Sequence, residues 1–219
     1  MEDFLKLKDT EAFELIEKLD AVYKTIEEKQ AEWLKVSLLN CPEACGSCCV
    51  NFEPDITEAE ALYLAYWLLT NQKEKAEALA EGTFLSLRKD NDKGCILFNP
   101  DSPYHCTVYA GRCLICRIFG YSGDTGKNGE RRWKPCRFYP QEKLSAHKPP
   151  LAHKQYSEEE LKNIFPSYPP AMSELMQQAL SILPGDQGAT VPLREALPPA
   201  IRKLKFLYNL VVNQSEENK

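Results

Sequence analysis

Apolar side chains recur with a helical period near the start of the chain. From residue 10 to about residue 38 they fall at steps of three and four residues, while Glu and Lys fill the opposite face. The stripe comprises Ala12, Ile16, Leu19, Tyr23, Ile26 and Trp33, with Gln30 as its one polar interruption. This spacing predicts one long helix whose apolar side packs against the rest of the protein.

Capping patterns mark where two further helices begin. Thr57 and Glu60 have the spacing of a capping box, in which each side chain bonds to the backbone of the other, and they open a helix that runs through Leu69. Ser157 and Glu160 repeat this spacing at a helix over 157–164. Apolar periodicity places other helices at about 72–89, 113–119, 170–183 and 195–213.

Other segments lack any such period. Residues 40–54 and 91–112 are interrupted by Pro and Gly, which break regular elements, and residues 122–128 are polar and rich in turn formers. Ten of the fifteen prolines and none of the cysteines lie from residue 140 onward. We therefore expect a mainly α protein with irregular loops. Residues 1–140 are predicted to form a core with an N-terminal helix, and residues 141–219 a helical extension packed on that core.

Composition limits the partners and the cellular location that we expect for the protein. The 219 residues carry a formal net charge of -5, which argues against broad contact with nucleic acid or an anionic membrane. The longest apolar run, 61–69, has nine residues, whereas a membrane-spanning helix needs roughly 20. Residues 1–10 mix acidic and basic side chains and contain no apolar signal-peptide core. We expect a cytoplasmic protein without a membrane partner.

The nine cysteines are the main chemical signal in the chain. In a reducing cytosol, an odd number of cysteines favours metal ligation or redox chemistry over structural disulfides. Scattered free cysteines that pack as small apolar side chains are the alternative. The clustering favours the first explanation, because four of the cysteines fall within the nine residues 41–49.

This first cluster, in the string CPEACGSCCV, consists of Cys41, Cys45, Cys48 and Cys49. Thiolates two or three residues apart in a loop can turn onto one centre, and such soft ligands select zinc, copper(I) or iron–sulfur clusters. The adjacent Cys48 and Cys49 point to opposite sides of an extended chain, so they share a centre only where the backbone bends sharply. Otherwise they serve two neighbouring metals. Both alternatives require ligands from elsewhere in the chain.

A second cluster supplies those ligands. It consists of Cys95, Cys106, Cys113, Cys116 and Cys136. Two residues separate Cys113 from Cys116, a common interval in zinc and iron–sulfur sites, but the interval is also one helical turn and equally suits inward packing of Cys113. The candidate metal ligands are Cys41, Cys45, Cys48, Cys49, Cys95, Cys106, Cys116 and Cys136. The expected fold is thus a small helical domain with irregular cysteine-rich loops wrapped around a metal centre.

Positive charge gathers beside the second cluster. Residues 111–137 contain seven Lys or Arg against two acidic residues, a local net charge of +5 (7 − 2) in a chain that totals -5. Arg112, Arg117 and Arg137 each adjoin a cysteine, and such charge offsets the cost of burying a negative thiolate centre. The remaining cations equally suit a solvated basic loop. The strip is too small to favour nucleic-acid binding.

No catalytic group stands out beside the cysteines. The sequence has no Gly-rich phosphate loop and no HExxH or GxSxG motif. CPEACGSC has the C-x3-C-x2-C spacing of radical-SAM enzymes, but the chain is too short and too helical for the barrel of that class. Of the three histidines, His105 flanks Cys106, while His147 and His153 lie in a proline-rich stretch.

The cysteine pattern resembles the CxxCxxCC cysteine-cluster family, the YkgJ-like zinc- or iron-chelating proteins. The matching pieces are CPEACGSCCV, the helix start TEAE at 57–60, GCILF at 94–98 and CTVYAGRCLICR at 106–117, so the resemblance spans about residues 41–117. The family pattern C-x-I-Y-x-x-R-P-x-x-C-R is matched by Cys106, Tyr109, Arg112, Cys116 and Arg117. Two features depart from the family. The first cysteine interval is three residues rather than two, and Cys113, which stands where proline is usual, and Cys136 are extra relative to the pattern, as added ligands or as packing residues.

The resemblance implies metal chelation and no particular reaction. We expect a cysteine-ligated iron–sulfur or zinc centre that serves redox chemistry, metal handling or protein modification. An iron–sulfur cluster is preferred, because at least six matching cysteines exceed the four ligands that close one structural zinc site. Two zinc ions are the alternative. A related domain occurs in flagellin lysine methylases, so an enzyme with the cluster as cofactor or scaffold is the rival function. A zinc-stapled module that binds a protein partner is a third.

Overall fold

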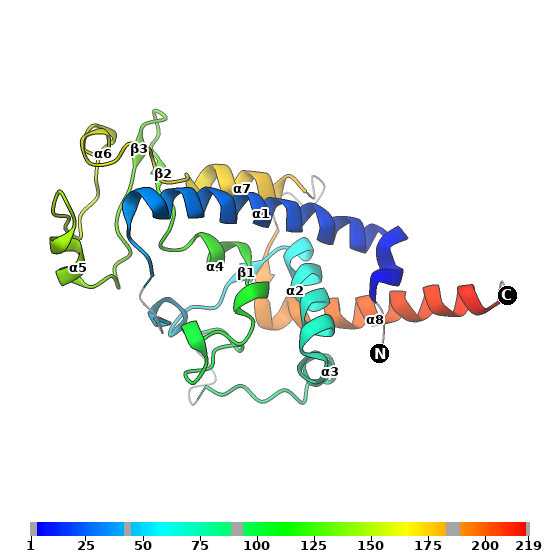
Figure 1. Ribbon diagram of the computed structural model, residues 1–219. Coiled ribbons are helices and arrows are strands. Elements are labelled where there is room, and N and C mark those ends of the chain that lie inside the picture. Colours follow the sequence, from blue (N-terminus) through cyan, green and yellow to red (C-terminus); the bar gives the residue numbers. More distant parts are fainter. Residues whose placement is uncertain (1–3, 42–44, 89–93, 183–188, 218–219) are drawn as a thin grey trace.

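The computed structural model describes residues 4–41, 45–88, 94–182 and 189–217 (Figure 1). Its helices are α1 (Glu11–Ser37), α2 (Glu58–Asn71), α3 (Lys73–Glu81), α4 (Leu114–Ile118), α5 (Gln141–Ala146), α6 (Glu158–Ile164), α7 (Met172–Leu180) and α8 (Leu193–Glu217). Short 3₁₀ turns are η1 (Phe4–Asp9), η2 (Ser47–Cys49), η3 (Pro103–His105) and η4 (Tyr109–Gly111). Two antiparallel pairs join β1 (Asp55–Ile56) to β4 (Val191–Pro192) and β2 (Asp124–Thr125) to β3 (Arg131–Arg132). The prediction of a mainly α protein with a cysteine-rich loop region is confirmed.

The predicted N-terminal helix is α1. It begins after Thr10, whose side-chain oxygen accepts a hydrogen bond from the Phe13 N–H at 3.3 Å. Its apolar stripe is buried, and the polar interruption is explained: buried Gln30 donates from Nε2 to the carbonyl of Arg117 at 2.7 Å. The helix ends at Ser37, and the residue that caps it, Leu38, has a left-handed φ of 55°.

The largest apolar core surrounds α2. The predicted capping box is present: the Glu60 N–H donates to the Thr57 hydroxyl at 3.3 Å, and the Thr57 N–H donates to the Glu60 carboxylate at 3.0 Å. Most of the apolar run of α2 is buried, with Tyr63, Tyr66 and Trp67 partly buried, and α2 packs on both α1 and α8. Farther along α8, the ring of Tyr208 lies 5.0 Å from that of Phe4. Among the described helices, none is long and apolar enough to cross a membrane.

Three segments differ from the sequence prediction. Helix α3 ends at Glu81 rather than near residue 89 (which lies outside the described residues), because Gly82 adopts a left-handed φ of 73° and terminates the helix. The turn-rich stretch 122–128 belongs to the β2–β3 hairpin, and residues 141–146 form α5 in a stretch where no helix was predicted. Elements this short leave no periodic pattern in the sequence.

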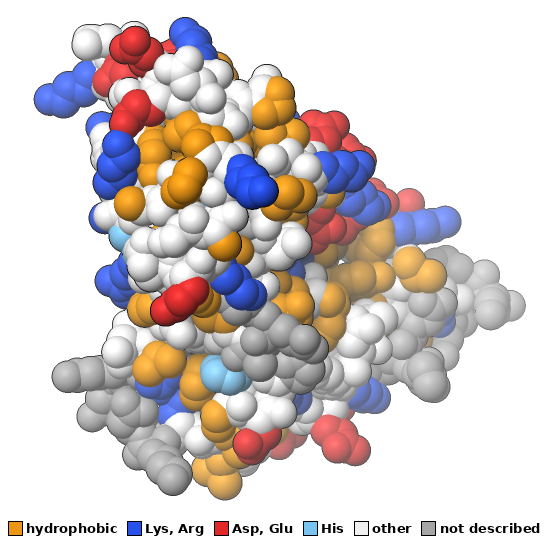
Figure 2. Space-filling view, turned by 60° about the vertical axis from the view of Figure 1, so that its left-hand side comes forward, with side chains coloured by type: hydrophobic (Ala, Val, Ile, Leu, Met, Phe, Trp, Pro, Cys, Tyr) orange, Lys and Arg blue, Asp and Glu red, His pale blue; other side chains and the backbone are white. Residues whose placement is uncertain are grey.

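Two smaller cores also form along α1. The middle of α1 packs on α4 and α7. Near its C-terminal end the Trp33 ring meets those of Trp133 and Phe165 edge-on, with centroids 5.9 and 4.8 Å apart. The face of the molecule that Figure 2 shows carries a mixture of hydrophobic, basic and acidic side chains. The cysteine-bearing loops lie below α1, to the left of α2 and α3 (Figure 1).

Candidate metal centre

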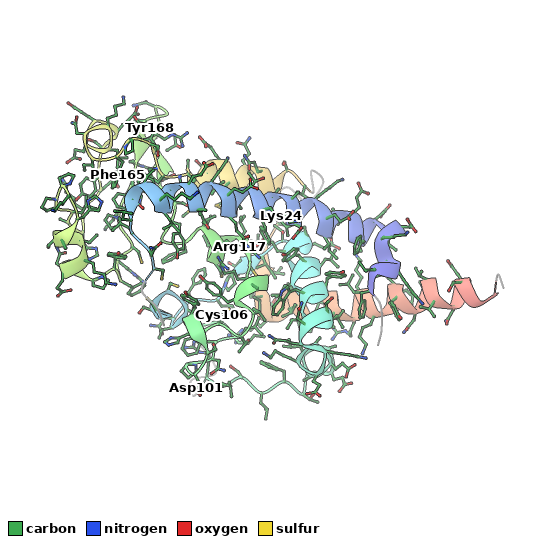
Figure 3. The ribbon with its side chains drawn as sticks, viewed as in Figure 1. Lys24, Asp101, Cys106, Arg117, Phe165 and Tyr168 are labelled. Atoms are coloured by element: carbon green, nitrogen blue, oxygen red, sulfur yellow. The ribbon has the colours of Figure 1, made fainter. Side chains whose placement is uncertain are left out.

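Seven of the nine cysteines line one cavity of about 80 Å³. They are Cys41, Cys45, Cys48, Cys49, Cys95, Cys106 and Cys116. All nine cysteines are free thiols. Figure 3 shows Cys106 among the loops below α1. The structure therefore brings the two clusters of the sequence together, although more than 40 residues separate Cys49 from Cys95.

Backbone contacts hold the first cysteine loop (residues 45–54) against the second (residues 94–112). The Cys95 N–H donates to the carbonyl of Phe52 at 2.9 Å. Buried Arg88 donates from its guanidinium to the carbonyls of Cys49, at 3.4 Å, and Val50. Within the second loop, Phe98 and Cys106 form an isolated antiparallel bridge. These contacts position the thiols without any regular sheet or long helix.

A tight turn resolves how the adjacent cysteines are placed. Cys48 and Cys49 lie in η2, where the Cys49 N–H donates to the carbonyl of Gly46 at 2.8 Å. This bend leaves the two Sγ atoms 3.7 Å apart. Two thiolates on one tetrahedral zinc, each at about 2.3 Å from the ion, are about 3.8 Å apart. The spacing of the pair thus suits two ligands of a single metal.

The two thiols of this pair differ in their pKa values. The hydrogen bond with Cys49 lowers the pKa of Cys48 to about 7, against the opposing effect of burial. The pKa of Cys49 is raised well above its usual range, first by that hydrogen bond and then by burial. Near neutral pH, Cys48 is therefore the better thiolate of the two.

Three cysteines of the second cluster are more deeply desolvated: Cys95 and Cys106 lie in the second loop, and Cys116 lies in α4. Burial raises the pKa of Cys95 to about 12, and it also raises the pKa values of Cys106 and Cys116. Backbone N–H groups oppose this effect at two of the three, because Leu97 hydrogen-bonds to Cys95, and Val108 to Cys106. In each case the donor lies two residues after the cysteine. Such N–H groups stabilise the negative thiolate that a metal requires.

Cys136 shares that local geometry. Burial raises its pKa, and the N–H of Phe138, again two residues on, lowers it. It lines a second cavity of about 40 Å³, which adjoins the first because Cys41, Cys45 and Cys48 line both. Cys113 differs: it is only 3 % exposed, lies in the apolar core around α2 and does not line either cavity.

Cations face the sulfur atoms, but only some of them are those that the sequence indicated. Arg112 lowers the pKa of Cys106 and Arg137 that of Cys136, as expected for charge compensation. Lys75 on α3 and Arg88 act in the same way on Cys106 and Cys95. Neither residue was predicted from the sequence, because both lie outside the cysteine clusters and no spacing pattern connects them to the site.

Arg117, which adjoins Cys116, has a different role. Its buried guanidinium lies beneath α1 (Figure 3) and pairs with Glu27 of that helix. It also donates to the carbonyls of Ala110 and Arg112, both at 2.8 Å. The charge of Arg117 thus fastens the second loop to α1.

Farther along the chain, Arg131 pairs with Glu174 and Arg132 pairs with Asp124, as expected for a solvated basic segment.

The thiols line a cavity, but in the described part of the chain their side chains are not arranged as a complete set of metal ligands. Among the described residues, no group of three or more His, Cys, Asp or Glu side chains is arranged to hold a metal ion. The donor chemistry fits zinc and iron, since clustered thiols with hydrogen-bonded sulfur atoms suit soft cations. Side-chain rotation into the cavity is needed to complete a site. The assignment of individual cysteines as ligands stays a prediction.

Comparison with known proteins identifies the family. Among curated proteins and solved structures, none matches the chain. Residues 40–160 match the family model CxxCxxCC, described as a "putative zinc- or iron-chelating domain". This match reaches beyond the 41–117 segment that carried the resemblance, and it includes Cys136. Because the matched segment covers more than half of the 219 residues, the chain belongs to the CxxCxxCC family.

Proposed function

We propose that this protein holds an iron–sulfur centre in the cysteine-lined cavity. The observation that carries the proposal is the gathering of seven free thiols, from two distant loops and helix α4, around one space. The proposed ligands come from Cys41, Cys45, Cys48, Cys49, Cys95, Cys106 and Cys116, with Cys136 in the adjoining cavity. A bound iron–sulfur cluster supplies one-electron redox chemistry.

Three features support a polynuclear centre over one structural zinc. A zinc site of that kind is closed by four ligands, and seven thiols exceed that number. The cavity of about 80 Å³ exceeds the roughly 10–15 Å³ that one water-sized sphere needs, so it has room for more than a single ion. The cations Lys75, Arg88 and Arg112 act on the thiols and favour the negative charge that a reduced cluster gains.

The remaining side chains of the site have protein-based roles in this proposal. Arg88 holds the first loop by its carbonyls and so keeps Cys49 beside the second loop. The aromatic rings of Phe98, Tyr104 and Tyr109 line the cavity and give it apolar walls beside the thiols. An apolar surround, hydrogen bonds to the sulfur atoms and nearby charge are the means by which a protein tunes a metal centre.

The test is the composition of protein purified without oxygen. Iron, acid-labile sulfide and zinc are measured per chain, together with the visible absorption spectrum. The proposal predicts a coloured protein with iron and sulfide in equal amounts. A colourless protein with stoichiometric zinc and no sulfide contradicts the iron–sulfur assignment while keeping the metal-chelating one.

Matched serine variants separate ligands from packing cysteines. Cys48→Ser and Cys106→Ser are expected to lose the iron–sulfur absorption, because each removes a thiol that lines the cavity. Cys113→Ser keeps every cavity-lining thiol and is expected to retain the absorption, at some cost in stability from a hydroxyl in the apolar core. Equal spectra for all three variants contradict the placement of the centre in this cavity.

A further inference from the structure

His105 lines the same cavity as the seven cysteines, and nothing assigned so far uses it. Its Nδ1 atom is buried and has no hydrogen-bond partner among the described residues. Buried polar atoms are nearly always paired, and an unpaired one costs about 1–3 kcal/mol unless water or an ion satisfies it. An imidazole ring that lines the thiol cavity and has an unpaired nitrogen can offer a lone pair to a metal ion.

The backbone holds this side chain in an unusual conformation. Tyr104 and His105 have φ values of 58° and 54°, in the left-handed region that side chains other than Gly rarely adopt. Hydrogen bonds fix the conformation from both sides: the His105 N–H donates to the carbonyl of Ser102 at 2.9 Å, and its own carbonyl accepts from the Asn99 N–H at 3.1 Å. Left-handed residues that surrounding contacts hold in place cluster at functional sites.

The imidazole ring is also held tightly between the two cysteine loops. A Cβ atom added to Gly46 of the first loop would lie 2.2 Å from Nδ1 of His105, so only glycine fits there. On another side, the ring meets Phe98 edge-on with centroids 5.6 Å apart. His105 belongs to the second loop but lies against Gly46, which directly follows Cys45.

We propose that His105 is a nitrogen ligand of the metal in this cavity, which makes the site a mixed cysteine and histidine site. The inference rests on the proposed function. Neutral imidazole suits both iron and zinc, and it replaces thiolates in zinc sites and in some two-iron clusters. A neutral ligand in place of a thiolate also reduces the negative charge that the buried site must bear. His105 would bond the metal through a nitrogen of its imidazole ring.

X-ray absorption at the edge of the metal that the purified protein holds, iron or zinc, tests the proposal directly. The wild-type protein is expected to show sulfur neighbours together with the multiple-scattering pattern of an imidazole ring. His105→Ala is expected to lose that pattern and to hold its metal about 10-fold or more weakly in competition with a chelator. A wild-type spectrum with sulfur neighbours alone overturns the inference and leaves the thiolate centre standing, without reliance on any variant.

Two further variants complete the design. Gly46→Ala keeps every cysteine and histidine but forces the His105 ring away from the first loop, so it is expected to reproduce the spectral change of His105→Ala. His153→Ala removes an exposed histidine that does not line the cavity and is expected to leave the spectrum unchanged. A wild-type protein without iron or zinc removes the proposed function and this inference together, whereas a metal signal identical in wild type and His105→Ala removes only the inference.

Discussion

At the scale of single residues, the nine cysteines are chemically distinct because their neighbours differ. Cys48 shares a hydrogen bond with Cys49 and is the more acidic thiol of that pair. Cys95 is desolvated and holds its proton. Cys113 is buried among apolar side chains, where it acts as a small hydrophobe. Residue type alone therefore does not predict which thiol reacts or ligates.

The first prediction concerns the reactivity of Cys48 in metal-free protein. Because its pKa is about 7, its alkylation by iodoacetamide is expected to rise as the pH passes through about 7, whereas Cys95, with a pKa of about 12, stays unreactive there. Mass spectrometry of each alkylated peptide measures the two rates. Cys49→Ala removes the hydrogen-bond partner and is expected to shift the Cys48 profile to higher pH. Equal rates for Cys48 and Cys95 at neutral pH contradict the prediction.

The second prediction concerns the pH dependence of metal binding. Burial raises the pKa values of Cys95, Cys106 and Cys116, so these thiols hold protons at neutral pH. A metal binds thiolates, and each of these ligands must first release its proton. Raising the pH therefore strengthens binding, by about tenfold per pH unit for each thiol that starts protonated. Zinc competition titrations across neutral pH are expected to show this rise, and a flat profile excludes these thiols as ligands.

At the scale of secondary-structure elements, buried polar side chains connect helices to the cysteine loops. Glu60 closes the capping box of α2 and also accepts a hydrogen bond from the Leu114 N–H of α4 at 2.8 Å. Burial raises the pKa of this carboxyl, while its hydrogen bonds lower it. Arg117 of α4 reaches Glu27 of α1. The short helix α4, which carries Cys116, thus depends on α1 and α2 for its position.

The third prediction follows from the burial of Arg117. Arg117→Ala removes a large side chain that is only 2 % exposed and leaves the carbonyls of Ala110 and Arg112 without their donor. The free energy of unfolding of the metal-free protein is expected to fall by about 3 kcal/mol or more, as measured by urea denaturation. Arg137→Ala, at an exposed arginine that also follows a cysteine, is the control and is expected to change it by less than about 0.5 kcal/mol. Equal effects of the two variants contradict the role of Arg117.

At the scale of the whole molecule, three apolar cores support a loop region that has little core of its own. α1, α2 and α8 pack through buried side chains, whereas residues 45–54 and 94–112 are held mainly by hydrogen bonds and by their few buried groups. Metal binding is therefore expected to act on the loops more than on the helices.

The division of the chain at residue 140 and the cytoplasmic location stay predictions.

The fourth prediction concerns removal of the metal. A thiolate-bound structural metal contributes on the order of 10 kcal/mol or more of apparent binding free energy, so chelation is expected to lower the melting temperature sharply. Hydrogen–deuterium exchange is expected to rise in residues 45–54 and 94–112 and to stay slow in α2 and α8, where the core is intact. Cys48→Ser is the control, because it should lower the melting temperature of metal-loaded protein but scarcely that of metal-free protein. An unchanged melting curve after complete metal removal would falsify this prediction.

Much of the fold was predictable because its signals are local. The period of α1 and the capping boxes of α2 and α6 depend on residues a few positions apart, and the structure has these helices where they were expected. The clustering of thiols likewise indicated metal chelation, in agreement with the family match. The short α5 and the β2–β3 hairpin escaped prediction, since tertiary contacts rather than periodicity hold such brief elements.

The sequence by itself determined the longer helices, the class of chemistry and the two cysteine segments. Only the tertiary structure decided which thiols meet: Cys116 reaches the cavity, while Cys113, one helical turn away, packs in the core. It also decided that Arg88 faces the loops and that Arg117 faces α1. The physical reason is that these outcomes depend on contacts between distant segments, such as the hydrogen bond from the Cys95 N–H to the Phe52 carbonyl. No spacing along the chain encodes such contacts.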